Sequence, residues 1–374
     1  MSTADLLYTD TEDALRDSVR RLLADRCPHE LVMSAYDSSP GDFSAVWKSL
    51  AVELGLSGLL APESIGGAGA GAREAAVVME EIGRAVAPVP YLSSAVLATV
   101  ALVKAGDTTI VRDLAEGTTT GALTIGLATP PDRFSATVRL GADGLTGRVT
   151  SVAGAAEAEL LVVPVQGPDG LELHTVRTDS AGVTVTPILA LDMTRPLADV
   201  DFTAPSSTRV DDGAAVEAIR GALLCGAALL ASEQLGVAQW CFDTTLAYVK
   251  ERKQFGRAVG SYQALKHRLA DLWLEITSAA AAARYAADTA ARYAADTAAR
   301  GDADAEIAAA IAQAYCSGVA VHAAEECVQL HGGLGMTWEY PAHLYLKRAK
   351  SDQLAFGTAY RHRARLAELI DLPA

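Results

Sequence analysis

The chain has 374 residues, half of them apolar, which is enough for two or three domains with a sizeable core. Its 46 acidic side chains outnumber 31 basic ones, and the net charge of −15 argues against a nucleic-acid partner and against binding to an anionic membrane surface. The five cysteines show no CxxC spacing and the N-terminal segment is acidic without an apolar run, so we expect free thiols in a cytoplasmic protein.

Residues 1–116 are predicted to form an N-terminal helical domain. The segment DTEDALRDSVRRLLADRC repeats apolar residues at helical spacing, and Thr11 and Asp13 are placed to cap its start. Further helices are predicted in DFSAVWKSLAVELG, before a loop rich in Pro and Gly, and in AREAAVVMEEIGRA. The last predicted helix of this domain, SSAVLATVALVKAG, ends at Gly106.

Residues 117–208 change to short β-branched runs separated by Gly, Asp and Pro, which predict a middle β domain. The runs are GALTIGLATP, ATVRLGADGLTGRVTSV, AELLVVPV, LELHTVRT and GVTVTPIL, with GADG as a hairpin turn. Residues 209–374 return to long Ala-rich helices and predict a C-terminal helical bundle. The order helices, sheet, helices predicts an α+β fold.

Two local features of the C-terminal part bear on its helices. The run GALLCGAALLA, after Arg220, is too short to span a bilayer and indicates a buried helix. The octapeptide ARYAADTA stands at 283–290 and again at 291–298. This duplication is predicted to lengthen a helix by roughly 12 Å near the tip of a helical hairpin.

The segment YVKERKQFGRAVGSYQALKHRL predicts a helix that runs into Arg252 and Phe255, breaks at Gly256 and Gly260, and restarts at Ser261. The three-residue spacing would put Arg252 and Phe255 on one helix face. A guanidinium beside an aromatic ring can bind a diphosphate and cover an adenine or a ribose. Taken alone, the segment is better explained by a solvated arginine and a core phenylalanine.

The segment AAEECVQLHGGLGMTWEYP predicts a helix that ends at Gly332 and Gly333, where a ligand could approach the backbone closely. Gln329 lies one turn earlier and offers both a donor and an acceptor. A helix C-cap without a ligand is a common alternative. Cys327 and His331 share a helix face, but without two further ligands we attribute them to packing and predict no metal site.

Together with AVELGLSGLLAPESIGGAGAG and MEEIGRAVAPVPY, these two segments resemble the acyl-CoA dehydrogenase family, and the resemblance covers essentially the whole chain. It implies a dimer or a dimer of dimers with FAD at the interface. In that family, RxxFG and QxxGG reach across to a flavin cofactor that the neighbouring subunit mainly holds, and a threonine near the C-terminus also contacts it. The matching residues are Arg252, Phe255, Gly256, Gln329, Gly332, Gly333 and Thr358.

The chain departs from the family in the segments that hold a subunit's own flavin ring. Where the family has a loop like TEPxxGSD, this chain reads LATPPDRFSATVRL, which keeps Thr129 and Pro130 but lacks the Gly-Ser-Asp. Where the family has W-x-T/S-N on a later strand, the chain reads RVTSVAGAAEAELLVV, without a tryptophan.

The family's catalytic base is also missing. In its YEGT pattern the glutamate removes the α-proton of the substrate, but this chain has Phe356 in the sequence AFGT. Some members carry the base on an earlier helix, about ten residues before a GxAQ-like segment. Here GVAQ begins at Gly236, so that position falls near Gly226. Glu233 is the nearest carboxylate, two turns farther along, and is better explained as structural.

The resemblance and its departures predict a non-catalytic subunit of a heteromeric acyl-CoA dehydrogenase, similar to those acting on sterol side-chain CoA thioesters. A homologous catalytic subunit would complete a heterotetramer that converts an acyl-CoA to the trans-2-enoyl-CoA and passes electrons to an electron-transferring flavoprotein. Two alternatives remain from the sequence. The chain could be an active homo-oligomer with an unrecognised base, or a flavin-free scaffold of the same fold.

Overall fold

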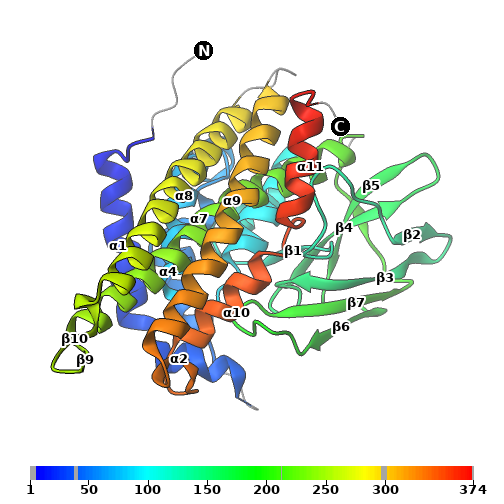
Figure 1. Cartoon of the computed structure of the whole chain (residues 1–374). Coiled ribbons are helices and arrows are strands. Elements are labelled where there is room, and N and C mark those ends of the chain that lie inside the picture. Colours follow the sequence, from blue (N-terminus) through cyan, green and yellow to red (C-terminus); the bar gives the residue numbers. More distant parts are fainter. Residues whose placement is uncertain (1–5, 38–40, 212, 296–300, 373–374) are drawn as a thin grey trace.

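The computed structural model describes residues 6–37, 41–211, 213–295 and 301–372, apart from the side chains of 293–302. Figure 1 shows the N-terminal helices and the C-terminal helices packed against each other, with the green sheet on one side of them. This arrangement confirms the predicted α+β fold with a helical first part, a middle sheet and a C-terminal helical bundle.

The N-terminal part is helical, as predicted. Its main helices are α1 (Asp10–Arg26), α2 (His29–Met33), α3 (Ser44–Lys48), α4 (Ala72–Ala85), the π-helix η5 (Tyr91–Ala98), α5 (Thr99–Ala105) and α6 (Thr109–Ala115). The predicted capping of α1 by Thr11 and Asp13 is wrong, because the N-cap is Thr9, two residues before Thr11, which forms a capping box with Glu12. Gly106 ends α5 with φ of 85°, which confirms the predicted stop.

The middle part is an eight-stranded sheet. Its strands are β1 (Gly121–Leu123), β2 (Val138–Gly141), β3 (Gly144–Ala153), β4 (Leu160–Gln166), β5 (Leu171–Arg177), β6 (Val183–Ile188), β7 (Leu197–Thr203) and β8 (Thr208–Arg209). They follow the order β6-β7-β3-β2-β4-β5-β8, and β1 pairs with β4. The GADG turn joins β2 to β3, as predicted.

Strand β7, LADVDFT, was not among the predicted runs. Its aspartates are depleted in strands generally, and they hide the alternation of Ala198, Val200 and Phe202 toward the core. Asp199 and Asp201 lie on the other face, where both pair with Arg148 of β3. On that face the strand is held by ion pairs rather than by β-branched side chains, and the prediction had relied on β-branched residues.

The C-terminal helices are α7 (Ala215–Glu251), α8 (Gln263–Ala295), α9 (Gly301–His331), α10 (Ala342–Asp352) and α11 (Ala359–Leu369). α8 contains the first ARYAADTA copy and the start of the second, whose end falls in residues 296–300, outside the described residues. Helix α7 and the part of α9 from Ala303 are long and apolar enough to cross a membrane, but 78% and 67% of their most apolar windows are buried within the fold. Such burial is typical of core helices.

Two glycines let α4 and α7 touch through their backbones. A Cβ at Gly83 would lie 2.1 Å from the carbonyl oxygen of Glu233, and a Cβ at Gly236 would lie 1.9 Å from the carbonyl oxygen of Glu80. No side chain larger than hydrogen fits at either position. The contact fixes the position of α7 along α4, and therefore the position of Glu233.

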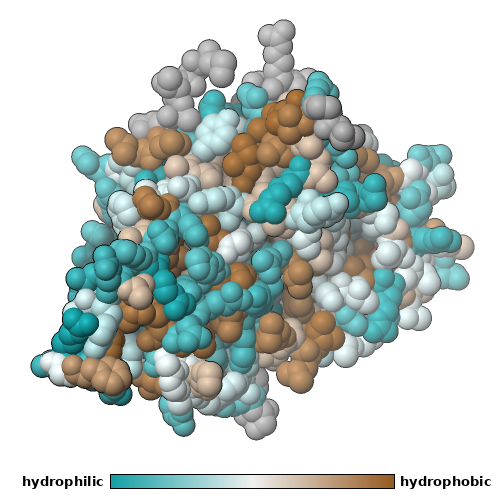
Figure 2. Space-filling model, viewed as in Figure 1, coloured by the Kyte–Doolittle hydropathy of each residue, from teal (hydrophilic) through white to brown (hydrophobic). Residues whose placement is uncertain are grey.

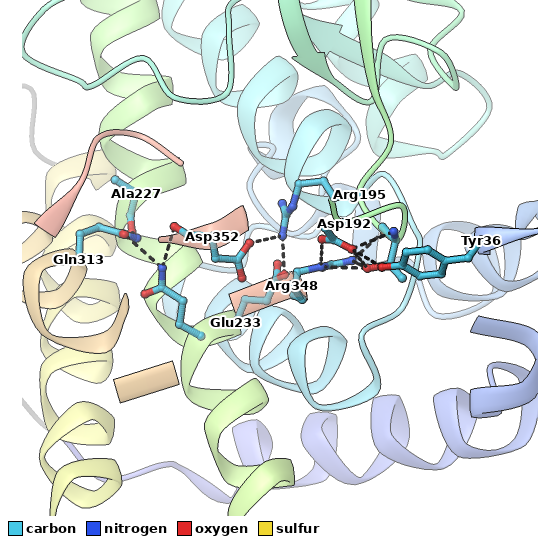
Figure 3. A network of polar contacts seen from close by, with 10 residues as sticks. Tyr36, Asp192, Arg195, Ala227, Glu233, Gln313, Arg348 and Asp352 are labelled. Carbon is cyan, nitrogen blue, oxygen red and sulfur yellow. Dashed lines mark hydrogen bonds and ion pairs between the residues drawn. The ribbon is translucent and has the colours of Figure 1, made fainter. Parts of the chain in front are cut away.

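A buried ionic network joins the three parts of the chain (Figure 3). Arg348 of α10 is 2% exposed and donates to Asp192 over 2.8 Å and to Glu233 over 2.5 Å. Arg195, on the loop between β6 and β7, also contacts Glu233 and lies 3.3 Å from Oδ1 of Asp352. The interpretation of Glu233 as a structural residue is therefore supported by two guanidinium partners.

The charges of this network balance when Asp352 is protonated, because Asp192 and Glu233 already match the two arginines. Burial and the neighbouring Glu233 carboxylate raise the pKa of Asp352 well above its ordinary value. Neither carboxyl oxygen of Asp352 has a hydrogen-bond partner among the described residues. At the position of Asp352, a neutral side chain is therefore favoured over a charged one.

We predict that Asp352→Asn stabilises the chain at neutral and alkaline pH. In the unfolded chain Asp352 loses its proton near pH 4, about the ordinary value, whereas in the folded chain it keeps the proton to a higher pH. The free energy of unfolding therefore falls as the pH rises from the ordinary pKa through the raised one, and the amide removes that loss. Urea unfolding between pH 4 and pH 8 should show a gain that grows with pH.

The matched control is Asp271→Asn, an exposed aspartate on α8. It should leave the free energy of unfolding nearly unchanged across the same range. A loss of stability in Asp352→Asn at pH 8 would show that Asp352 is charged in the folded chain.

Candidate functional site

The RxxFG segment forms a hairpin rather than a helix face. Helix α7 ends at Glu251, and Arg252 is already extended, with ψ of 125°. The strands β9 (Lys253–Gln254) and β10 (Arg257–Ala258) pair across a two-residue turn, in which Phe255 and Gly256 have φ of 53° and 79°. The prediction that Arg252 and Phe255 share a helix face is therefore wrong, because the chain leaves the helix one residue before Arg252.

The hairpin presents its functional groups outward. Phe255 is 90% exposed, and Arg252 is exposed with no carboxylate partner among the described residues. Figure 2 shows hydrophobic atoms at the corner of the molecule that β9 and β10 occupy in Figure 1. A turn of this type favours Asn and Gly, so a left-handed phenylalanine here is strained as well as exposed.

The QxxGG segment ends α9, as predicted. Gln329 is exposed in the last turn, and the helix stops at Gly332, whose φ of 60° suits a residue without a side chain. A Cβ at Gly332 or Gly333 would meet no atom within 4 Å, so the outer side of this turn is open. The turn can accept a ligand from outside the chain without any rearrangement.

The hairpin and the glycine turn lie at the same end of the helical bundle. The ring of Tyr248, in the last turn of α7, stacks on the ring of His331 at the end of α9, with 4.4 Å between centroids. Because Tyr248 precedes Arg252 by one helical turn, this contact brings the two segments together. The sequence placed them in one site only through the family resemblance.

Phe356 stands at the position where the family resemblance predicts a base. Its side chain is 1% exposed, and a Cβ at Gly226 would lie 2.9 Å from Cζ of Phe356 and 2.6 Å from Cδ2 of Leu97. The two alternative base positions, 356 and 226, therefore open into one pocket, which a phenyl ring and a leucine occupy. The sequence alone could not show that these two positions meet.

Three titratable groups near Gly226 are poor candidates for a base. Burial raises the pKa of the Cys225 thiol to about 12, and burial also raises the pKa of Tyr91. In contrast, Arg195 and Arg348 hold the pKa of Glu233 below its ordinary value despite its burial, and both partners occupy its carboxylate. None of these groups would take a proton from carbon at neutral pH.

A hollow of about 620 Å³ lies in the β domain, beside Phe356. It is lined by residues 124–130, 133–137 and 148–151 and by Pro164, so the two segments that depart from the family pattern meet there. The backbone N–H of Phe356 donates to the carbonyl oxygen of Leu127 over 2.8 Å, and Gly357 lies against Pro130. Thr358 caps α11 at this edge, and its hydroxyl accepts from the N–H of Arg361.

The floor of the hollow departs from a regular strand. The pairing of β3 with β7 shifts between Val149 and Val152, and Ser151 has φ of 57°. The N–H of Ser151 donates to Asp199 instead of to the ladder. This bulge was not predicted, and the only sequence signal for it is the acidic residue on the partner strand.

The candidate site therefore has two separate parts. The hairpin and the glycine turn lie on the opposite side of the molecule from the sheet and its hollow, as Figure 1 shows for β9, β10 and β3. Arg252, Phe255, Gly256, Gln329, Gly332 and Gly333 belong to the first part, whereas Phe356 and Thr358 belong to the second.

Comparison with known proteins gives a consistent family. The description "Acyl-CoA dehydrogenase, N-terminal domain" matches residues 9–121, and "Acyl-CoA dehydrogenase, C-terminal domain" matches residues 213–370. The chain is 32% identical over 358 residues to the acyl-CoA dehydrogenase IpdE2 of Mycolicibacterium smegmatis, covering 96% of this chain and 98% of that protein.

Solved structures extend the likeness to the fold. A variant of the Tcur3481-Tcur3483 steroid ACAD is 28% identical, with a TM-score of 0.82 over 97% of this chain and 98% of its own. The ChsE4-ChsE5 complex from Mycobacterium tuberculosis is 26% identical, with a TM-score of 0.84 over 99% of this chain and 100% of its own.

We predict that Gly226→Ala destabilises the chain, although alanine normally stabilises a helix interior. The new methyl group would overlap the ends of Leu97 and Phe356, and overpacking of this kind costs about 1–3 kcal/mol. The double variant with Phe356→Leu should recover part of that loss, because the contact with Phe356 is relieved while the one with Leu97 remains. Urea unfolding of the single and double variants measures both effects.

Gly318→Ala is the matched control, because a Cβ at this position on α9 would meet nothing within 4 Å. It should stabilise the chain by about 0.5–1 kcal/mol. Equal effects of the two alanine substitutions would contradict the filled pocket.

Proposed function

Since the chain belongs to the acyl-CoA dehydrogenase family, whose members bind FAD, we propose that it is the non-catalytic subunit of a heteromeric acyl-CoA dehydrogenase. A homologous subunit would carry the base and hold the flavin ring, and the complex would oxidise the Cα–Cβ bond of an acyl-CoA. The observation that carries this proposal is the phenyl ring of Phe356 in the pocket where positions 356 and 226 meet.

The two parts of the site support different roles. We call the hairpin and the glycine turn the outward side of the chain, and the surroundings of Phe356 and the hollow its inward side. The outward side keeps an exposed cation, an exposed aromatic ring, an amide and an open glycine turn, in Arg252, Phe255, Gln329 and Gly332. The inward side has an apolar plug at the base position and a loop without the Gly-Ser-Asp of the family. Random loss of function would affect both sides alike, whereas a partner subunit needs only the outward one.

The residues of the outward side fit the diphosphate and adenosine portion of FAD. The Arg252 guanidinium suits a diphosphate, and the Phe255 ring can cover an adenine or a ribose. Gln329 can donate and accept hydrogen bonds at the same turn, and Gly332 and Gly333 leave room for a close approach. When bound, FAD supplies the acceptor for the hydride that leaves the substrate.

On the inward side, the residues of this chain exclude substrate rather than bind it. Phe356 and Leu97 fill the space that an acyl chain and a base would share, and apolar packing keeps water out of it. The proton of the substrate would therefore be removed in the partner, by a carboxylate that this chain does not supply.

The relatives support both the heteromer and the substrate class. The ChsE4-ChsE5 structure is described as a complex, and the Tcur3481-Tcur3483 structure likewise carries the names of two proteins. The Tcur3481-Tcur3483 protein is described as a steroid ACAD. We propose a steroid-derived CoA thioester as the substrate of the complex and an electron-transferring flavoprotein as its electron acceptor.

The chain purified alone should retain little FAD, whereas the complex with a co-expressed homologous subunit should retain FAD after gel filtration. The physical reason is that the outward residues bind only one end of the cofactor. Flavin absorbance per mole of chain measures both. A stoichiometric yellow protein obtained without any partner would favour an active homo-oligomer, and a colourless complex would favour a flavin-free scaffold.

Phe356→Glu should not create a second active site in the complex. The carboxylate would replace a buried ring, and desolvation would raise its pKa, so that some stability would be lost. Turnover per complex should stay the same or fall, as measured with an artificial electron acceptor. The decisive background is a complex whose partner has lost its own base, because activity there would mean that this chain can hold a complete site.

A further inference from the structure

His331 is a buried polar residue at the end of α9, between Gln329 and the glycine turn. Its side chain is 2% exposed and touches three different segments. Nδ1 lies 2.7 Å from the carbonyl oxygen of Cys327, Nε2 lies 2.7 Å from the hydroxyl of Tyr340, and Tyr248 stacks on the ring. These contacts join the end of α9 to α7 and to the segment that follows the glycine turn.

The hydrogen bonds fix the orientation of the ring. The carbonyl oxygen of Cys327 can only accept, so Nδ1 of the neutral ring carries the proton. Nε2 is then an acceptor, and the Tyr340 hydroxyl donates to it. Both ring nitrogens are satisfied away from solvent, which leaves the imidazole a single orientation.

Tyr248 connects this ring to the hairpin. It lies in the last turn of α7, and its carbonyl oxygen accepts from the backbone N–H of Arg252 over 2.9 Å. Its hydroxyl donates to the carbonyl oxygen of His331 over 3.4 Å. The backbone of Arg252 in turn accepts from the N–H of Val259, which closes the base of the hairpin.

The glycine turn is tied to the same ring from the other side. Gly335 packs so tightly that a Cβ there would lie 2.3 Å from the carbonyl oxygen of Val328 and 3.0 Å from Cβ of His331. The chain then continues to Tyr340, whose ring lies 4.6 Å from that of His331. The turn is therefore folded back over His331 and held there by the Tyr340 hydroxyl.

We propose that His331 is a positioning residue that, clamped between Tyr248 and Tyr340, holds the Arg252 hairpin and the Gln329–Gly333 turn in one fixed relation. The two segments can then contact a single FAD molecule without first being ordered, and preorganisation of this kind raises affinity. The inference rests on the proposed function, because it takes the outward side as the FAD-binding side. Neither His331 nor its two tyrosines needs to touch the cofactor.

The experiment uses the complex of this chain with its co-expressed catalytic partner. The variants are Tyr340→Phe, which removes one hydroxyl, His331→Leu, which removes the ring, and the combination of both. Arg252→Ala reports on the FAD site itself. Tyr315→Phe, on the surface of α9, is the matched control for loss of a tyrosine hydroxyl.

Two quantities are measured for each complex: the Kd for FAD, by flavin fluorescence after removal and readdition of the cofactor, and turnover at saturating FAD. Tyr340→Phe and His331→Leu should each weaken FAD binding by about tenfold, the effect of one unpaired buried polar group. Saturating FAD should restore turnover, because the base is in the partner. The double variant should be no weaker than His331→Leu alone.

The outcomes separate the two proposals. If Arg252→Ala weakens FAD binding but Tyr340→Phe and His331→Leu do not, the FAD site stands and the positioning role is wrong. If Arg252→Ala also has no effect, the FAD site and the positioning role fall together. Turnover that stays low at saturating FAD would assign the tyrosine and the histidine to the fold instead. Tyr340→Phe decides the question even if His331→Leu does not assemble.

Discussion

Arg348 carries the contact on which the arrangement of the whole chain depends. A buried guanidinium is costly unless it is paired. Arg348, on α10, is paired with Asp192 from the loop between β6 and β7 and with Glu233 from α7. Its Nη2 also donates to the carbonyl oxygen of Thr194. Because any displacement of one part would leave a charge unpaired, the sheet, α7 and α10 have one mutual position.

That position decides what the end of the chain can do. Asp352 ends α10 within the network, and Phe356 follows it by four residues, so the network delivers the phenyl ring to Gly226 on α7. The backbone of Phe356 is held at the same time by the carbonyl of Leu127. The two positions at which the resemblance predicts a base, 356 and 226, therefore face the same space. In this chain Phe356 and Leu97 fill that space.

The sequence predicted the features that depend on local chemistry and missed those that depend on distant partners. The helices, the GADG turn and the stop at Gly106 follow from periodicity and turn residues. Thr9 was missed in favour of Thr11 because only the reciprocal bond with Glu12 distinguishes them. The interpretation of Glu233 as structural needs no knowledge of its partners. Its ion pairs with Arg195 and Arg348 could not be predicted, because these arginines come from other parts of the chain and leave no local pattern. For the same reason, the contact between Tyr248 and His331 could not be predicted from spacing.

Two phenylalanines show how differently the two sides of the chain are used. Phe255 and Phe356 both have left-handed backbones, with φ of 53° and 55°, which a bulky residue rarely adopts. For Phe356 the burial of a full aromatic ring offsets the strain. Phe255 is 90% exposed, so nothing within the described residues offsets it. Backbone strain that no contact within the chain offsets is typical of a surface that binds a ligand. The hairpin that carries Phe255 is the one that the Tyr248–His331 contact holds in place.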